Sequence, residues 1–172
     1  MDIVSKFTLA SEEGLHNLFL LKKDQLLNMY RGSVQQDVLN EYIEVQLNKK
    51  DALRDLNNMS SQMITVFAED VPVGYVIMKQ SLSRPKVLTE QKAINYASFY
   101  IMHEHDNAET RASLWNKCLS VTHNYDAMWI EVLQTAPLIP FLESCGFQRH
   151  EQSEMKPFDK ASYILIRPKM EN

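Results

Sequence analysis

Side chains that can transfer protons or bind cations gather in one short stretch of the sequence, His103-Glu104-His105-Asp106. Imidazole and carboxylate groups are also metal ligands, but a tetrahedral site needs four ligands, and no cysteine or distant histidine pair completes such a set here. We therefore expect no bound metal. Glu104 and His103 are candidates for a general base, a group that accepts a proton during a reaction. The alternative interpretation of Glu104 is a solvated loop residue.

A second carboxylate with possible chemistry is Glu131, which lies inside the apolar segment Ala127 to Leu133. Burial in such a segment disfavours the charged form of the side chain and would make Glu131 a better proton acceptor. The alternative is that Glu131 faces solvent from one side of a strand. The two cysteines, Cys118 and Cys145, are expected to be reduced and largely buried rather than nucleophilic.

The composition is that of an ordinary globular protein. The chain has 172 residues, of which 45% are hydrophobic and 23% charged, and its net charge is -4. This length suffices for a sizeable core and suits a single domain over residues 1–172. Nothing indicates a basic face for nucleic acid, a signal peptide, or a membrane span of about 20 apolar residues. We therefore expect a cytoplasmic protein without nucleic-acid or membrane partners.

The N-terminal third is predicted to hold one strand, over Asp2 to Phe7, followed by helices. Ser11 is the expected N-cap of the first helix, which has an apolar face and ends at Gly32. Ser33 and Gln36 form a capping-box pattern for the second helix. A short third helical piece is expected around residues 52–56. The second helix is expected to carry an i, i+4 apolar stripe made of Val34, Val38, Tyr42 and Val45.

The rest of the chain is predicted to alternate strands with two helices. The helices are expected at Ala108 to Val121 and within residues 137–145, where Pro140 favours a late start near Ile139 and Gly146 marks the end. Residues 69–72 are predicted to form a hairpin turn, and residues 81–90 a loop. This order is typical of a mixed α/β (α+β) protein with one central sheet. The expected strands are Met63 to Ala68, Val73 to Met78, Ile94 to Met102, Ala127 to Leu133, Phe147 to Gln152 and Ser162 to Arg167.

This order, with three motifs inside it, resembles the GNAT N-acetyltransferase family from end to end. The motifs are VFAEDVPVGYVIM, WIEVLQTAPLIPFLESCGF with its Gly146-Phe147 pair, and SYILIRPKM. The resemblance implies a central mixed, mostly antiparallel sheet flanked by helices. It also implies transfer of an acetyl group from acetyl-CoA to the amine of a small molecule or peptide. Because family members often dimerise, a homodimer is a further possibility.

The resemblance also implies where the cofactor binds. The pyrophosphate would lie at the N–H groups that begin the helix after the long strand, and N–H groups at the end of that strand would polarise the thioester carbonyl. A water ordered by Glu131 or Glu104 would take the amine proton. The residues expected to bind the cofactor are Ile101, Met102, Asn107, Ala108, Glu109, Thr110, Arg111 and Ala112.

The chain departs from the family pattern at this helix start. The family motif is Arg or Gln, two residues, Gly, one residue, then Gly or Ala; here Asp106 replaces the first residue, and Glu109 and Arg111 replace the small ones. Asp106 and Glu109 instead form a capping-box pattern, and their charges would repel a pyrophosphate. Leu142 replaces the tyrosine that often protonates the leaving thiolate. Two alternatives follow: a binding module whose cofactor site is closed, or an enzyme that holds another acyl-CoA differently.

Overall fold

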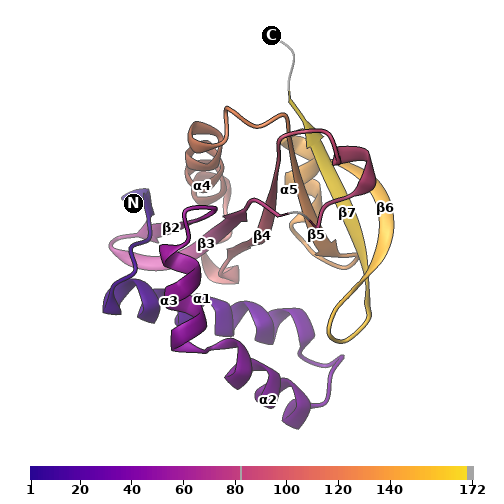
Figure 1. Ribbon diagram of the computed structural model, residues 1–172. Coiled ribbons are helices and arrows are strands. Elements are labelled where there is room, and N and C mark those ends of the chain that lie inside the picture. Colours follow the sequence, from indigo (N-terminus) through magenta and orange to yellow (C-terminus); the bar gives the residue numbers. More distant parts are fainter. Residues whose placement is uncertain (82, 170–172) are drawn as a thin grey trace. The chain divides into compact units, whose positions relative to one another are not determined.

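The structure is a computed structural model that describes residues 1–81 and 83–169. It is a mixed α/β fold with a seven-stranded, mostly antiparallel sheet flanked by helices, as the sequence predicted (Figure 1). The strand order is β1-β2-β3-β4-β5-β7-β6, and β4 pairs with β5 in parallel. The elements are β1 (Ile3–Phe7), α1 (Glu12–Tyr30), α2 (Gln36–Gln46), α3 (Lys49–Asn57), β2 (Ser61–Ala68), β3 (Val71–Lys79), η1 (Lys86–Leu88), β4 (Ala93–Ile101), η2 (His103–His105), α4 (Ala108–Val121), β5 (Ala127–Leu133), α5 (Ile139–Ser144), β6 (Gln148–Met155) and β7 (Lys160–Pro168).

The chain divides into two compact units. Unit 1 consists of Met1–Ile77 and Ser98–Val121, and therefore holds β1, β2, the helices α1 to α4, most of β3 and the end of β4. Unit 2 consists of Met78–Ala97 and Thr122–Asn172, and holds the start of β4 together with β5, α5, β6 and β7. None of the described helices combines the length and the apolar character needed to cross a membrane.

The first helix begins where the sequence predicts. The Ser11 hydroxyl oxygen accepts a hydrogen bond from the N–H of Gly14 at 3.0 Å, which satisfies one of the donors that a helix start leaves unpaired. At the other end, Gly32 has a φ of 84°, a conformation that favours glycine. The apolar side of α1 contributes to one core cluster of unit 1, formed by Leu15, Leu18, Leu21, Ala52, Met63 and Tyr75.

The second helix differs from the prediction in its cap and in its buried face. Its N-cap is Gln35, whose side chain makes no capping bond, and the Ser33 hydroxyl instead donates to the Tyr30 carbonyl at 3.2 Å, so the predicted capping box is wrong. The buried residues are Leu39 and Ile43, whereas Val38 and Val45, two members of the predicted stripe, are exposed. Leu39 and Ile43 each lie one residue after a member of the predicted stripe. Because successive residues of a helix are turned by about 100°, this shift places a different face of α2 toward the core.

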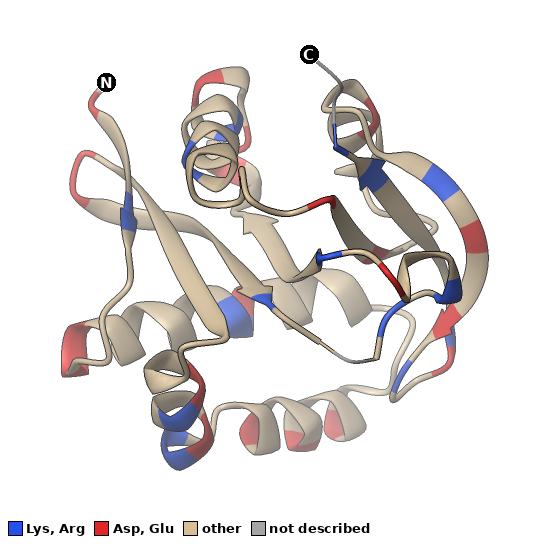
Figure 2. Ribbon diagram, turned by 45° about the horizontal axis from the view of Figure 1, so that its top comes forward, with Lys and Arg blue, Asp and Glu red and all other residues tan. Residues whose placement is uncertain are grey.

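The exposed side of α2 is acidic. Its charged residues are Asp37, Glu41 and Glu44, and it carries no lysine or arginine (Figure 2). The neighbouring α3, over Lys49–Asn57, mixes both signs and covers the predicted helical piece at 52–56.

The hairpin between β2 and β3 is tighter than predicted. Glu69 and Asp70 form the turn, with φ values of 50° and 65°, and β3 starts at Val71. Two-residue turns with positive φ at both positions match the twist of paired strands, so Pro72 lies inside β3 rather than in the turn. The predicted loop at 81–90 contains the short helix η1; Leu82 lies outside the described residues.

Unit 2 follows the prediction closely. The observed β5 has the predicted bounds, and β6 and β7 run beyond theirs, to Met155 and Pro168. The helix α5 begins at Ile139, the late start that Pro140 favours, and Gly146 after it has a φ of 99°. Both cysteines carry thiols rather than a disulfide; Cys118 is buried in unit 1, and Cys145 is half-buried in unit 2.

Candidate functional site

The residues predicted to bind the cofactor form one continuous segment of unit 1. It runs from the end of β4 through η2 to the first turns of α4, which has the predicted bounds (Figure 1). Ile101 is buried at the end of β4. The N–H of Met102 donates to the carbonyl of Val73 at 2.8 Å. The predicted contact of this N–H with a thioester carbonyl therefore does not fit the structure, because the pairing with β3 already uses the donor.

The start of α4 is capped by Asn107. Its side-chain oxygen accepts the N–H of Thr110 at 3.0 Å, and its carbonyl accepts the N–H of Arg111 at 3.0 Å. The predicted capping box with Asp106 is therefore wrong, because the residue immediately before the helix takes the N-cap position. Helix geometry leaves the first two helical N–H groups, those of Ala108 and Glu109, without an intrahelical acceptor.

Asp106 forms an ion pair instead of a cap. Its two oxygens meet Nε and Nη2 of Arg111, the second at 2.8 Å, so that the contact is bidentate. The Asp106 side chain is 19% exposed and that of Arg111 is 28% exposed. Hydrogen bonding to Asp106 raises the pKa of the Arg111 guanidinium above its already high value. The pair is neutral overall, so Asp106 adds little negative charge to the helix start.

The remaining predicted residues of this segment differ in exposure. Glu104, Glu109 and Ala112 are exposed, which for Glu104 matches the solvated-loop interpretation. Thr110 is buried, and its hydroxyl has no hydrogen-bond partner within the described part of the chain. The helix start therefore offers two N–H groups and one uncompensated carboxylate, that of Glu109. Such an end can hold an anion, with Glu109 opposing it.

Glu131, the other predicted base, is oriented by a serine. It is half-buried on β5, and its Oε2 accepts a hydrogen bond from the hydroxyl of Ser162 at 2.7 Å. Ser162 is fully buried on β7, and its carbonyl accepts a hydrogen bond from the side chain of Gln134 at 3.3 Å. Glu131 is therefore held in place rather than simply solvated.

A polar cluster in unit 1 was not predicted from the sequence. The hydroxyl of Tyr100 on β4 donates to Oδ2 of Asp24 on α1, and the side-chain amide of Asn28 donates to the Tyr100 oxygen at 2.7 Å. Beside it, the hydroxyl of Tyr75 donates to the side chain of Gln25. Burial raises the pKa of Tyr75, and burial together with Asp24 raises that of Tyr100, both well above the usual tyrosine value. One sequence signal could have indicated this cluster. Three polar residues lie within about one turn of the helix, where side chains are neighbours: Asp24, Gln25 and Asn28.

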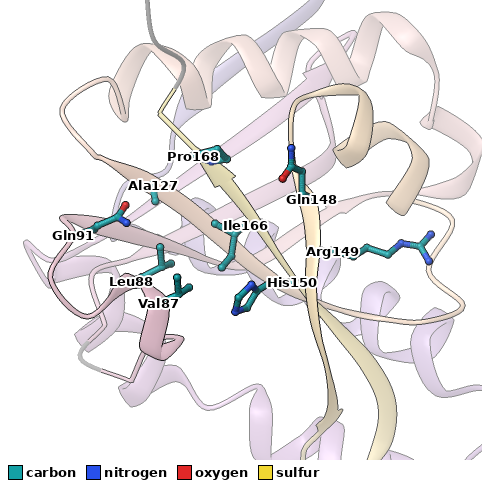
Figure 3. Close-up of a pocket in the computed structure, with 9 residues that line it drawn as sticks. All are labelled: Val87, Leu88, Gln91, Ala127, Gln148, Arg149, His150, Ile166 and Pro168. Atoms are coloured by element: carbon teal, nitrogen blue, oxygen red, sulfur yellow. The ribbon is translucent and has the colours of Figure 1, made fainter.

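A shallow cavity of about 230 Å³ lies in unit 2 (Figure 3). Leu88, Ala127 and Ile166 give it an apolar lining, and Gln148 and His150 contribute polar groups. The Arg149 side chain points away from the cavity toward its partner Glu143, 3.4 Å from it. None of the predicted site residues lines this cavity. Elsewhere in residues 1–81 and 83–169, no three His, Cys, Asp or Glu side chains lie together in a way that could hold a metal ion.

Comparison with solved structures identifies the fold. PaiA N-acetyltransferase from Thermoplasma acidophilum, in complex with coenzyme A, matches with a TM-score of 0.77 and 13% identity over 98% of this chain and 99% of that one. Spermidine N-acetyltransferase from Vibrio cholerae, in complex with CoA and spermine, matches with a TM-score of 0.66 and 12% identity over 97% and 95%. The ribosomal-protein-S18-alanine N-acetyltransferase from Escherichia coli matches with a TM-score of 0.63 and 9% identity over 98% and 96%.

This chain therefore has the fold of the GNAT acetyltransferases, which confirms the resemblance seen in the sequence. No protein-family model and no curated protein sequence matches the chain. At these identities the likeness establishes the fold and not the activity, since one fold hosts many functions.

Proposed function

We propose that this chain is an N-acetyltransferase that takes the acetyl group of acetyl-CoA and transfers it to an amine. The observation that carries the proposal is the start of α4, where Ala108 and Glu109 present N–H groups to which the helix itself offers no acceptor. Such a helix start is an anion site suited to a pyrophosphate. Two structurally similar acetyltransferases are in complex with coenzyme A, which supports the same donor here.

Two features of the side chains around this helix start are compatible with a bound pyrophosphate, and one opposes it. Arg111 neutralises Asp106, so the aspartate that replaces the family's basic residue does not present its charge. Ala108 has a small, exposed side chain that leaves the backbone accessible. Glu109 is the one adverse charge in the first turn. The backbone N–H groups of Ala108 and Glu109 would hold the pyrophosphate of the donor, whose thioester supplies an activated acetyl group.

The acceptor amine must lose a proton as it reacts, and two carboxylates are candidates to receive it. Glu131 is half-buried and held by Ser162, an arrangement that suits a base acting directly or through a water. Glu104 is exposed and has no such support. Glu131 is therefore the better candidate, and its replacement by Gln tests the assignment through the pH dependence of acetyl transfer.

Titration calorimetry with acetyl-CoA and with CoA tests donor binding directly. Ala108 is the first helical residue, a position where proline is tolerated and carries no N–H, so Ala108→Pro removes one proposed donor without breaking the helix. We expect the wild type to bind CoA and the variant to bind about 10- to 100-fold more weakly, the range for a hydrogen bond to a charged group. Glu109→Gln should bind more tightly than the wild type.

Two results would contradict this proposal. Absence of heat and of any thermal shift in the wild-type protein at high acetyl-CoA concentration would exclude the donor. Unchanged affinity in a folded Ala108→Pro variant would show that the helix start does not hold the pyrophosphate.

One observation favours a second candidate function, a binding module without catalysis. The bidentate Asp106–Arg111 pair stands at the connection where the GNAT motif has a basic or amide residue and small ones. If this pair closes the site, the triple variant Asp106→Gln, Glu109→Gly, Arg111→Gly, which restores the motif, should bind CoA while the wild type does not. Binding by the wild type at least as tight as by the triple variant would exclude a closed site.

A further inference from the structure

We propose that Asp24, Asn28 and Tyr100 form a recognition site for a primary ammonium group, so that the acceptor amine arrives as a cation. The inference rests on the proposed function, because it names the class of the acceptor. It begins from the carboxylate of Asp24, which has no cationic partner among residues 1–81 and 83–169.

The three side chains come from two elements of unit 1. Asp24 and Asn28 lie one turn apart on the same side of α1, and Tyr100 lies on β4, one residue before its end. The side-chain nitrogen of Asn28 donates to the Tyr100 hydroxyl at 2.7 Å, to the Asp24 carbonyl at 3.0 Å and to Asp24 Oδ2 at 3.3 Å. Tyr100 donates its hydroxyl hydrogen to the same Oδ2. The network fixes all three groups before any ligand binds.

The donors that meet Asp24 are all neutral. Its side chain is half-buried, yet no lysine, arginine or histidine of the described residues forms an ion pair with it. Tyr100 remains a neutral phenol, because burial and the adjacent carboxylate hold its pKa above the usual value. The cluster therefore keeps one net negative charge, on a half-buried carboxylate next to the exposed side chain of Asn28.

The acceptor capacity of the cluster suits an ammonium group. Both protein donors use Oδ2 of Asp24, so Oδ1 keeps its lone pairs, and the side-chain oxygen of Asn28 is also unused within the described chain. A primary ammonium brings three N–H donors and one positive charge. An alcohol could use the same acceptors but would gain no charge attraction, and an anion would be repelled.

The neighbouring surface of unit 1 adds to the preference for cations. From Lys22 to Gln46 the sequence has four carboxylates and three cationic side chains, a net charge of 3 − 4 = −1, and the cations precede α2 in the chain. Three of these carboxylates are the acidic residues of α2 (Figure 2). A surface of one sign raises the local concentration of ligands of the opposite sign. The site also lies on β4, the strand that leads through η2 to the start of α4.

The test uses the full-length protein without CoA, and compares n-hexylamine with n-hexanol as probes. We expect heteronuclear NMR shifts at residues 24–28 and at Tyr100 on addition of hexylamine. Hexanol should bind at least about 10-fold more weakly than hexylamine. Asp24→Asn keeps the shape and an acceptor for Tyr100 but removes the charge, so it should weaken hexylamine binding about 10-fold and leave hexanol unchanged. Asp70→Asn, an exposed change of the same charge in the β2–β3 turn, is the matched control and should change neither.

Each other outcome overturns the inference. Equal binding of the two probes, shifts confined to other residues, or unchanged hexylamine binding by Asp24→Asn would do so. If Asp24 only ties α1 to β4, the variant would change the melting temperature and not the ratio of the two affinities. Tyr100→Phe is a second variant that keeps the carboxylate, and it should still prefer the amine. Because the probes are tested without donor, failure of acetyl-CoA binding would contradict the proposed function and leave this result standing.

Discussion

Two aspartates of unit 1 are both half-buried, but they differ in the charge of the groups that donate hydrogen bonds to them. Asp106, before α4, meets the guanidinium of Arg111 through both of its oxygens. Asp24, on α1, accepts hydrogen bonds from Tyr100 and Asn28, which are neutral. The first carboxylate is neutralised by the chain, and the second keeps its charge.

The difference separates a structural role from a binding role. An ion pair with good geometry satisfies its own charges, so Asp106 and Arg111 fix the connection between β4 and α4. A carboxylate whose charge is not neutralised by any described residue can take a cationic partner from outside the chain. The family motif directs attention to Asp106 and the start of α4, whereas the carboxylate without an ion pair is Asp24, on α1.

The largest expected effect comes from Gly74 on β3, which allows close approach to the backbone that carries Tyr100. A Cβ at this position would lie 2.7 Å from the Tyr100 carbonyl oxygen and 3.0 Å from the side chains of Ile101 and Val66. Because a backbone atom must move, Gly74→Ala should destabilise the protein by about 3 kcal/mol and weaken the contact of Tyr100 with Asp24. Urea denaturation measures the first effect, and changes in the NMR shifts of Tyr100 and Asp24 relative to the wild type measure the second.

A second glycine separates steric from conformational effects. At Gly32 a Cβ would meet nothing within 4 Å, but φ is 84°, so Gly32→Ala should be destabilising by only about 1 kcal/mol. Equal effects of the two substitutions would show that crowding beneath Tyr100 is not important.

The next effect concerns the neutralised aspartate. Arg111→Ala removes a charge-assisted, bidentate contact and leaves Asp106 unpaired, so we expect a loss of about 1–2 kcal/mol in the free energy of unfolding. The control is Arg54→Ala, which breaks a pair with Asp51 whose side chains are 69% and 56% exposed, and should change stability by less than about 0.5 kcal/mol. If the two variants behave alike, the Asp106–Arg111 pair does not organise the start of α4.

A smaller effect should appear at high pH through the tyrosines of the polar cluster around Asp24. Unfolded tyrosine ionises near pH 10, whereas burial raises the pKa of Tyr75 and Tyr100 in the folded protein. The unfolded state therefore loses protons first, so this contribution to stability is complete below about pH 10 and declines as the pH rises above it. Tyr100→Phe should make the decline shallower, as followed by denaturation at several pH values. An unchanged slope would show that Tyr100 is not held neutral by its surroundings.

Sequence alone predicted those parts of the fold that local patterns determine. The bounds of α4 and β5 agree with the predicted Ala108 to Val121 and Ala127 to Leu133. The Ser11 cap, the glycine after α5 and the late start of that helix each depend on residues within one or two turns. The order of such elements, together with the three motifs inside it, then led to the resemblance to the GNAT fold.

The same local patterns could not choose between neighbouring solutions. Asp106 and Asn107 are both good N-cap residues, and the pairing of Asp106 with Arg111 accompanies the choice of Asn107. In α2 the two apolar stripes differ by one residue, and packing against the rest of unit 1 selects Leu39 and Ile43.

The Asp24 cluster was beyond prediction for another reason. Asp24 and Tyr100 are separated by 76 positions, so only the folded sheet and helix bring them together. Within α1, Asp24 has the same appearance as any acidic residue on a solvated helix face. That no described residue forms an ion pair with it is a property of the structure, not of the sequence.

The smallest expected effect on stability is that of Asp24→Asn. The asparagine side chain still accepts the hydroxyl hydrogen of Tyr100, and the change removes an unpaired charge, so stability should stay within about 0.5 kcal/mol of the wild type or rise. Asp24→Ala leaves the hydroxyl hydrogen of the half-buried Tyr100 without its acceptor, so this variant should instead be destabilised by about 1 kcal/mol. Urea denaturation of both variants measures the difference. If Asp24→Asn were as destabilising as Arg111→Ala, the charge of Asp24 would be structural, and the contrast between the two aspartates would disappear. If it is stable and no longer distinguishes hexylamine from hexanol, the charge serves a ligand rather than the fold.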